Sequence, residues 1–328
     1  MSEPAPEGAA TPSVETPRER VAHAMYATVE RAAMTLPEAW GRRLFHLGGA
    51  AAFHLLPGTR AVVERNLSRV LGPAAGAEVL RAASREAFLS YARYWYDTFR
   101  VRALPDEEFM ARFRGEGDEN LATAVEAGKG GIVAVPHLGN WDGAGKRVHL
   151  MGWRITAVAE VLRPERLFRL FLDHRRALGM GIVPLYDDRS VAQELVRLLS
   201  RNEIIALVAD RDLKGTGVEV EMFGETRLLP AGPALLSLAT GAPLLPCSVY
   251  DEGEGWVMMV EPPLVIERTD SLRDDVTTLT RALAARFERA IAAAPTQWHM
   301  FQPAWPADEA ASPPGAGAGP ARVPAASG

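Results

Sequence analysis

Apolar residues recur at every third or fourth position through the first third of the chain, which is the period of an amphipathic helix. Leu44, Leu47, Ala51 and Leu55 follow this spacing. The stretches RAVVERNLSRVLG and VLRAASREAFLSYARYWYDTF continue it. The pattern therefore predicts a helical section over residues 21–115.

From residue 116 onward, short apolar runs alternate with stretches of helical spacing. Runs at 130–136, 154–160, 181–186 and 203–210 have the length and bounding residues of buried strands, and amphipathic segments separate them. Alternating strands and helices are typical of an α/β fold, in which a mostly parallel central sheet is flanked by helices.

The two ends of the chain differ from the middle. Residues 1–20 are acidic and rich in Pro, and residues 307–328 are rich in Ala, Gly and Pro, so both are predicted to be disordered. Between them there is no linker. We therefore expect one domain over 21–306, with the helical part at 21–115 and an α/β core at 116–306.

Composition narrows the class of protein. The 328 residues are 48% hydrophobic and 23% charged, as in a folded globular chain, and the net charge of −5 gives no indication of nucleic-acid binding. The single cysteine, Cys247, excludes an internal disulfide. The longest apolar stretch, residues 44–56, is shorter than the ~20 residues of a membrane-spanning helix.

A candidate base follows the first predicted strand. His137 comes just after that strand, and Asp142 falls in the first turn of the helix that Trp141 would open. A carboxylate there can accept the N–H of the imidazole and leave the other ring nitrogen as a base. The alternative is that His137 is an ordinary turn residue and Asp142 an ordinary residue of a helix N-terminus.

Other polar residues follow the later strands. Arg163 follows the second, and Asp210 and Arg211 come at the end of the fourth. Ligands bind at the carboxyl ends of such strands, so these side chains are expected at one edge of the sheet. There is no nucleophilic-serine elbow and no Walker loop, the other histidines do not form a metal set, and Cys247 lies in a predicted buried strand.

The segment HLGNWD (137–142) matches the HxxxxD signature of glycerolipid acyltransferases. The phrases GKGGIVAVPHLGNWD, VLRPE, FLDHRRALGM, VADRDLKGTGVEVEMFGE and WHMFQPAW extend the match. Over about residues 30–305 the chain resembles the lauroyl/myristoyl branch of this family, the bacterial lipid A biosynthesis acyltransferases. Its details are most similar to the members that acylate mannosylated phosphatidylinositol.

The resemblance implies the transfer of a long, palmitoyl-type acyl group from acyl-CoA, as co-substrate, to a mannose hydroxyl, with no other cofactor and no metal. It gives His137 the role of general base and makes Asp210 its acidic partner. Glu219 and Glu221 are weaker candidates for that second carboxylate. The alternatives are an acyl-CoA thioesterase, in which His137 would activate water, and a non-catalytic lipid-binding protein.

Four arginines are candidates for binding the CoA phosphates, because guanidinium groups suit phosphate oxygens. The resemblance places Arg175 near acyl-CoA, although Arg176 aligns equally well, and Arg163 and Arg211 would join them from the strand ends. The alternative for each is simple exposure at the surface.

The helical section offers a membrane contact. The resemblance implies a peripheral protein at the cytoplasmic face of the cell membrane, and Trp40, Phe45 and Phe53 could lie in the lipid interface. The alternative is that they pack against the rest of the protein. The aromatic stripe between Tyr91 and Phe99 is expected mainly as helix–helix core.

Overall fold

The computed structural model describes residues 16–162, 164–185, 189–212 and 215–309. Five helices come first: α1 (Pro17–Thr35), α2 (Glu38–Leu55), α3 (Pro57–Leu71), α4 (Ala77–Ala103) and α5 (Asp106–Arg112). α1 begins four residues before the predicted start of the helical section, because Thr16 and Glu19 form a capping box around its first turn.

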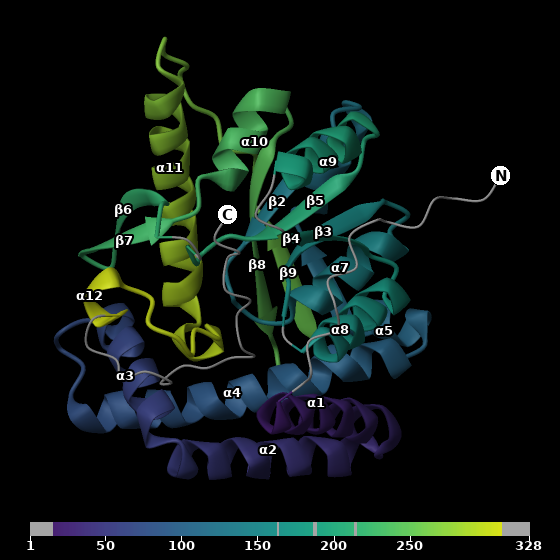
Figure 1. Cartoon of the computed structure of the whole chain (residues 1–328), viewed down its shortest axis with the longest axis vertical. Coiled ribbons are helices and arrows are strands. Elements are labelled where there is room, and N and C mark those ends of the chain that lie inside the picture. The colour runs from purple at the N-terminus through teal and green to yellow at the C-terminus, as the bar shows by residue number, and fades with distance from the viewer. Residues whose placement is uncertain (1–15, 163, 186–188, 213–214, 310–328) are drawn as a thin grey trace.

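The first four helices form a layer below the lower ends of the strands in Figure 1, where α4 lies between α2 and the sheet. Tyr94, Tyr96 and Phe99 of the aromatic stripe are buried, so α4 supplies core contacts. Phe53 is also buried and packs in a cluster with Val63, Leu67, Ala87 and Phe88. Phe53 is therefore a core residue and does not reach a lipid interface.

The central sheet has seven strands in the order β1-β9-β8-β2-β5-β3-β4. They are β1 (Phe113–Glu116), β2 (Gly131–Val135), β3 (Ile155–Glu160), β4 (Gly181–Leu185), β5 (Ile204–Val208), β8 (Leu244–Asp251) and β9 (Trp256–Val260). All neighbouring pairs are parallel except β8 and β9, which form an antiparallel pair. The predicted α/β class with a mostly parallel sheet is confirmed.

Helices cover both faces of the sheet. They are α6 (Asp118–Glu126), α7 (Trp141–Leu150), α8 (Glu165–Ala177), α9 (Arg189–Ser200), α10 (Gly232–Thr240) and α11 (Leu272–Ala293). Side chains alternate along β2: Ile132 and Ala134 pack with α9, α10 and α11, whereas Val133 and Val135 pack with α6 and α7. Because both sets are buried, β2 is apolar at every position.

Three features differ from the sequence pattern. β6 (Val218–Met222) and β7 (Glu225–Leu229) form a separate antiparallel hairpin. β9 ends at Val260, although the apolar pattern continues beyond it. After the 3₁₀ turn η1 (Pro295–Gln297), the short helix α12 (Pro306–Glu309) occupies the start of the expected tail, whose remaining residues lie outside the described ranges.

Candidate active site

Two neighbouring strands bring His137 and Asp210 together. β2 and β5 are parallel, with Val135 opposite Val208, and each chain continues for two residues to the polar side chain. Nδ1 of His137 lies 2.5 Å from Oδ1 of Asp210, and the backbone N–H of His137 donates to Oδ2 at 3.0 Å. The carboxylate that holds the imidazole is therefore Asp210, in direct contact.

Asp210 is fully buried and surrounded by donors. The indole N–H of Trp298 donates to Oδ2 at 2.8 Å, and the guanidinium of Arg227 donates to the backbone carbonyl of Asp210. Burial by itself would raise the pKa of Asp210. The attraction and hydrogen bond of His137, the charge of Arg227 and the bond from Trp298 outweigh it, so the pKa lies below its ordinary value and the carboxyl is ionised.

Arg227 and Trp298 were not predicted as site residues, because neither follows one of the strands used to locate the site. Arg227 comes from β7, is only 1% exposed, and lies 5.2 Å from the ring centres of both Trp298 and Trp305. Burial lowers the pKa of Arg227 to about 10, against the attraction of Asp210, and the group stays cationic at neutral pH. Arg227 lies two residues before Leu229, so the two side chains point to the same, buried face of β7. An arginine at such a position is unusual, and this spacing is the feature of the sequence that could have indicated its role.

The turn after His137 is fixed on several sides. Gly139 has φ +62°, and a Cβ atom there would lie 2.1 Å from the carbonyl oxygen of Val249. Asn140 caps α7, since its Oδ1 accepts the N–H of Gly143 at 2.9 Å. The carbonyl of His137 accepts the N–H of His299 at 2.7 Å. These contacts hold the imidazole at one position above the sheet edge.

Aromatic rings surround the exposed side of the imidazole. Its side chain remains 26% exposed, and the ring of Trp141 meets it edge-on with centres 5.5 Å apart. Trp141 stacks on Tyr94 at 4.5 Å. Burial and the nearby His137 lower the pKa of His299 to about 3, so this second imidazole is neutral. His137 is thus the imidazole of this cluster that a substrate can reach.

Asp142 has a different partner from the one expected. Its Oδ1 lies 2.7 Å from Nε of Arg175, and the carboxylate is buried. The expectation that Asp142 holds the imidazole is wrong, because Asp210 occupies Nδ1 and Asp142 pairs with α8. Burial opposes the charge of Arg175, but the ion pair with Asp142 raises its pKa, so the guanidinium remains charged.

The other expected phosphate ligands are spread out. Arg163 lies outside the described residues. Arg176 is exposed on α8, next to Arg175. Arg211, directly after Asp210, lies 3.8 Å from a carboxylate oxygen of Glu160 at the end of β3. Phosphate binding by any of them stays a prediction.

The two weaker carboxylate candidates do not compete for His137 in this arrangement. Glu219 and Glu221 are exposed on β6, whose buried positions are Val220 and Met222. The alternation of the strand directs both carboxylates outward.

A small apolar cavity lies beside the dyad. It measures about 50 Å³, and its wall includes side chains of β2, β3 and β5, of α7 (among them Trp141 and Asp142), and Arg175 of α8. Cys247 also lines it, and burial raises the pKa of that thiol to about 12, so the sulfur stays protonated. Within the described ranges, no group of three or more His, Cys, Asp or Glu side chains is placed to hold a metal ion.

Comparison with known proteins agrees with this architecture. Residues 9–306 match the family model described as bacterial lipid A biosynthesis acyltransferase. A phosphatidylinositol mannoside acyltransferase from Mycolicibacterium smegmatis is 40% identical over 284 residues, which cover 86% of this chain and 91% of the relative. One from Mycobacterium tuberculosis is 41% identical over 289 residues, covering 86% and 88%.

Proposed function

We propose, because the chain belongs to the bacterial lipid A biosynthesis acyltransferase family, that it transfers an acyl group from acyl-CoA to a mannose hydroxyl of a phosphatidylinositol mannoside. The names of its relatives supply the acceptor. The observation that carries the mechanism is the 2.5 Å contact between a partly exposed His137 and a buried, ionised Asp210.

In this mechanism His137 is the general base. Its Nε2 takes the proton of the sugar hydroxyl while that oxygen bonds to the thioester carbonyl carbon. The tetrahedral intermediate then expels the CoA thiolate, which takes the proton back from the imidazolium. Asp210 accepts the Nδ1–H bond throughout and stabilises the imidazolium, and a base placed in this way contributes ~10²–10⁴-fold in rate.

The oxyanion of the intermediate needs donors nearby. The backbone N–H groups of Trp141 and Asp142 are candidates, since they begin α7 four and five residues after His137. N–H groups in the first turn of a helix have no partner within the helix, and the helix dipole favours negative charge there. The Asp142–Arg175 pair then serves to hold α7 and α8 in register around this turn.

The apolar cavity supports a site for the acyl chain. Its present volume of about 50 Å³ is far below the ~300–1,000 Å³ of typical ligand pockets, so a palmitoyl-type chain requires this cavity to widen. The candidates for the CoA phosphates are Arg163, Arg175, Arg176 and Arg211.

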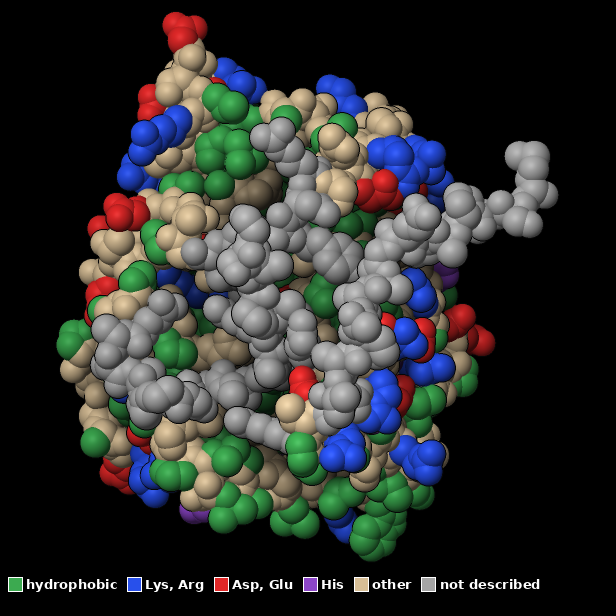
Figure 2. Space-filling view, viewed as in Figure 1, with side chains coloured by type: hydrophobic (Ala, Val, Ile, Leu, Met, Phe, Trp, Pro, Cys, Tyr) green, Lys and Arg blue, Asp and Glu red, His purple; other side chains and the backbone are tan. Residues whose placement is uncertain are grey.

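A stripe on α2 supports contact with a membrane surface. Trp40, Leu44, Leu47 and Leu55 are between 51% and 75% exposed and share one helical face. Figure 2 shows hydrophobic side chains along the lower edge of the molecule, where α2 runs in Figure 1. No helix in the described part of the chain is long and apolar enough to cross a membrane.

In this proposal α2 lies on the lipid surface at the cytoplasmic face, with its apolar stripe in the interface. Sedimentation with anionic phospholipid vesicles tests it. Leu44→Glu should abolish vesicle binding, whereas Leu235→Glu, at a similarly exposed leucine on α10, should leave it intact. Equal binding by both variants would exclude α2 as the contact.

The reaction itself is tested by CoA release from palmitoyl-CoA, with and without a phosphatidylinositol mannoside, for the wild type and for His137→Ala. We expect acceptor-dependent release that falls by ~10²–10⁴-fold in the variant. Acceptor-independent release would indicate a thioesterase. Tight acyl-CoA binding with no release under either condition would indicate a lipid-binding protein.

A further inference from the structure

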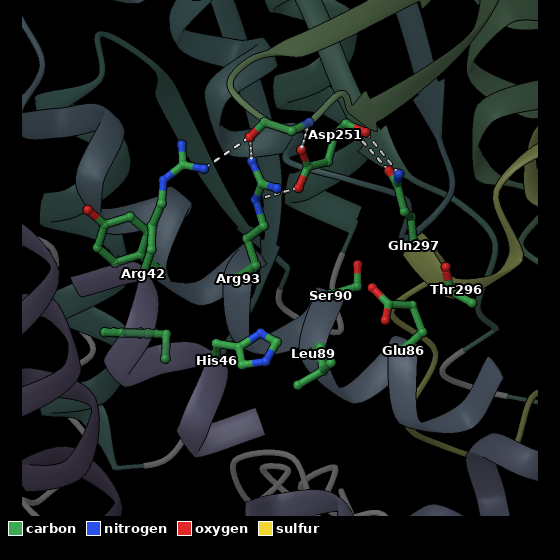
Figure 3. Close-up of a pocket in the computed structure, with 12 residues that line it drawn as sticks. Arg42, His46, Glu86, Leu89, Ser90, Arg93, Asp251, Thr296 and Gln297 are labelled. Carbon is green, nitrogen blue, oxygen red and sulfur yellow. Dashed lines mark hydrogen bonds and ion pairs between the residues drawn. The ribbon is translucent and has the colours of Figure 1, made fainter. Parts of the chain in front are cut away.

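A second pocket shares no lining residue with the cavity beside His137 and Asp210. It has a volume of about 330 Å³, at the lower end of the range for small-ligand sites. Figure 3 shows Arg42 and His46 entering it from α2, Glu86 and Arg93 from α4, and Asp251 and Gln297 from the opposite wall.

One wall of the pocket is held rigidly. Nε of Arg93 lies 2.5 Å from Oδ2 of Asp251, and both Arg93 and Arg42 donate to the carbonyl of Gly253, the latter at 3.0 Å. Gln297 and the backbone of Asp251 exchange two hydrogen bonds, at 2.8 and 3.0 Å. Polar groups fixed in this way lose little freedom when a ligand binds them.

Other polar groups around the pocket are uncommitted. Glu86 and His46 are exposed at the rim and form no ion pair within the described ranges. A carboxylate accepts hydrogen bonds and an imidazole can donate or accept them, so these two side chains offer both roles to a ligand.

The charge balance of the lining indicates the chemistry of the ligand. Arg42 and Arg93 are matched by Glu86 and Asp251, and both arginines already bind protein oxygens. A phosphate would favour uncompensated cations. A neutral ring that carries several hydroxyls needs donors and acceptors together, with an apolar surface such as Phe45 for its C–H groups.

The position of the pocket connects it to the reaction. Oγ of Ser90, in its lining, lies 3.2 Å from Nε2 of His299, whose backbone N–H binds the carbonyl of His137. Arg42 and His46 stand on α2, whose other face carries the exposed stripe that includes Leu44. A headgroup bound here would therefore stand between the lipid-facing helix and the catalytic turn.

We propose that this pocket binds a neutral six-membered polyol ring, a pyranose or cyclitol, and that the ring is one of the glycolipid acceptor that does not react. That the ring belongs to the glycolipid acceptor rests on the proposed function. That the ligand is a neutral polyol ring rests on the lining of the pocket alone.

Titration of methyl α-D-mannopyranoside and of myo-inositol, followed by NMR of the whole chain, tests the chemistry. Wild type and His137→Ala should bind one of these rings equally. Glu86→Gln and His46→Phe should weaken binding ~10-fold, the size of one lost hydrogen bond. Glu78→Gln, an exposed carboxylate elsewhere on α4, is the matched control and should bind as wild type.

The Michaelis constant for the intact glycolipid identifies the source of the ring. Glu86→Gln and His46→Phe should raise it ~10-fold with kcat and melting temperature unchanged, since both side chains are exposed and neither forms an ion pair among the described residues. This result without binding of either free ring would assign the pocket to the membrane-held headgroup. Unchanged ring binding and an unchanged Michaelis constant in both variants would overturn the proposal. Ring binding by a chain that shows no acyl transfer would retain the pocket and reject the proposed reaction.

Discussion

Replacing Asp210 by Asn would separate the charge of this residue from its shape. In the wild type, Oδ2 accepts N–H groups from the backbone of His137 at 3.0 Å and from Trp298 at 2.8 Å, and both groups can only donate. The oxygen of the new amide must therefore take the Oδ2 position, because an NH₂ group there would face two donors. The NH₂ group then faces Nδ1 of His137.

This geometry forces the imidazole into the wrong tautomer. An NH₂ group opposite Nδ1 donates to it, so the ring proton moves to Nε2, the nitrogen that would have to accept the proton of the substrate hydroxyl. The variant also lacks the negative charge that stabilises the imidazolium. We expect Asp210→Asn to lower kcat by ~10⁴-fold, as in other His–Asp pairs where the carboxylate becomes an amide. The Michaelis constants should change little, because Asp210 is fully buried.

The assay is acceptor-dependent CoA release, combined with ¹⁵N NMR of the His137 ring to identify the tautomer. Glu219→Gln makes the same chemical change on the exposed side of β6 and should retain the wild-type rate. Raising the pH should not rescue Asp210→Asn. A variant that keeps its kcat within ~10-fold of wild type, or a ring that still carries the proton on Nδ1, would refute this account of the pair.

Three further predictions concern the surroundings of the dyad. Gly139→Ala should lose more than ~2 kcal/mol of unfolding free energy in urea, because a left-handed φ is joined by a clash with the Val249 carbonyl. His174 is buried, with both ring nitrogens unpartnered among the described residues, and burial lowers its pKa to about 4. Between about pH 6.5 and 4 the unfolded chain therefore binds a proton at His174 that the folded chain does not bind, so the wild type loses ~3 kcal/mol of stability over this range. In thermal melts across the same range, His174→Phe should not show this loss. Arg175→Met should cost ~3–5 kcal/mol by leaving Asp142 buried and unpaired, and adding Asp142→Asn should restore much of it in the same urea assay.

That His137 and Asp210 lie at the same edge of the sheet could be predicted from the sequence, because it depends only on where two strands end, whereas their pairing was implied by the family resemblance. Both residues come two positions after the last paired residue of a parallel strand, and parallel strands end at the same edge. The strand order was not available from the pattern. β5 lies directly between β2 and β3 in the sheet, so Asp210 is adjacent to His137 and no water has to bridge them.

The partner of Asp142 could not be predicted in the same way. Asp142 and Arg175 stand on different helices, and their contact depends on how α8 docks beside α7. Helical periodicity shows which face of a helix is buried, but it does not show which distant side chain meets that face. The short spacing in sequence suggested His137 as the partner of Asp142. In the structure, Asp142 instead pairs with the guanidinium of Arg175 on α8.

The ionisation of Asp210 shows why the late elements of the chain belong to the chemistry. A carboxyl that is fully buried normally becomes harder to ionise, and a protonated Asp210 could not stabilise an imidazolium. His137 contributes most to reversing that tendency, and Arg227 from the β6–β7 hairpin and Trp298 from the segment after α11 add to it. Because Arg227 is itself buried between two indoles yet still cationic at neutral pH, its charge acts on Asp210 with little screening by water. In the proposed reaction His137 of the HxxxxD segment is the base, and the ionised carboxylate that holds its ring depends in part on a hairpin and a C-terminal segment that lie far from it in sequence.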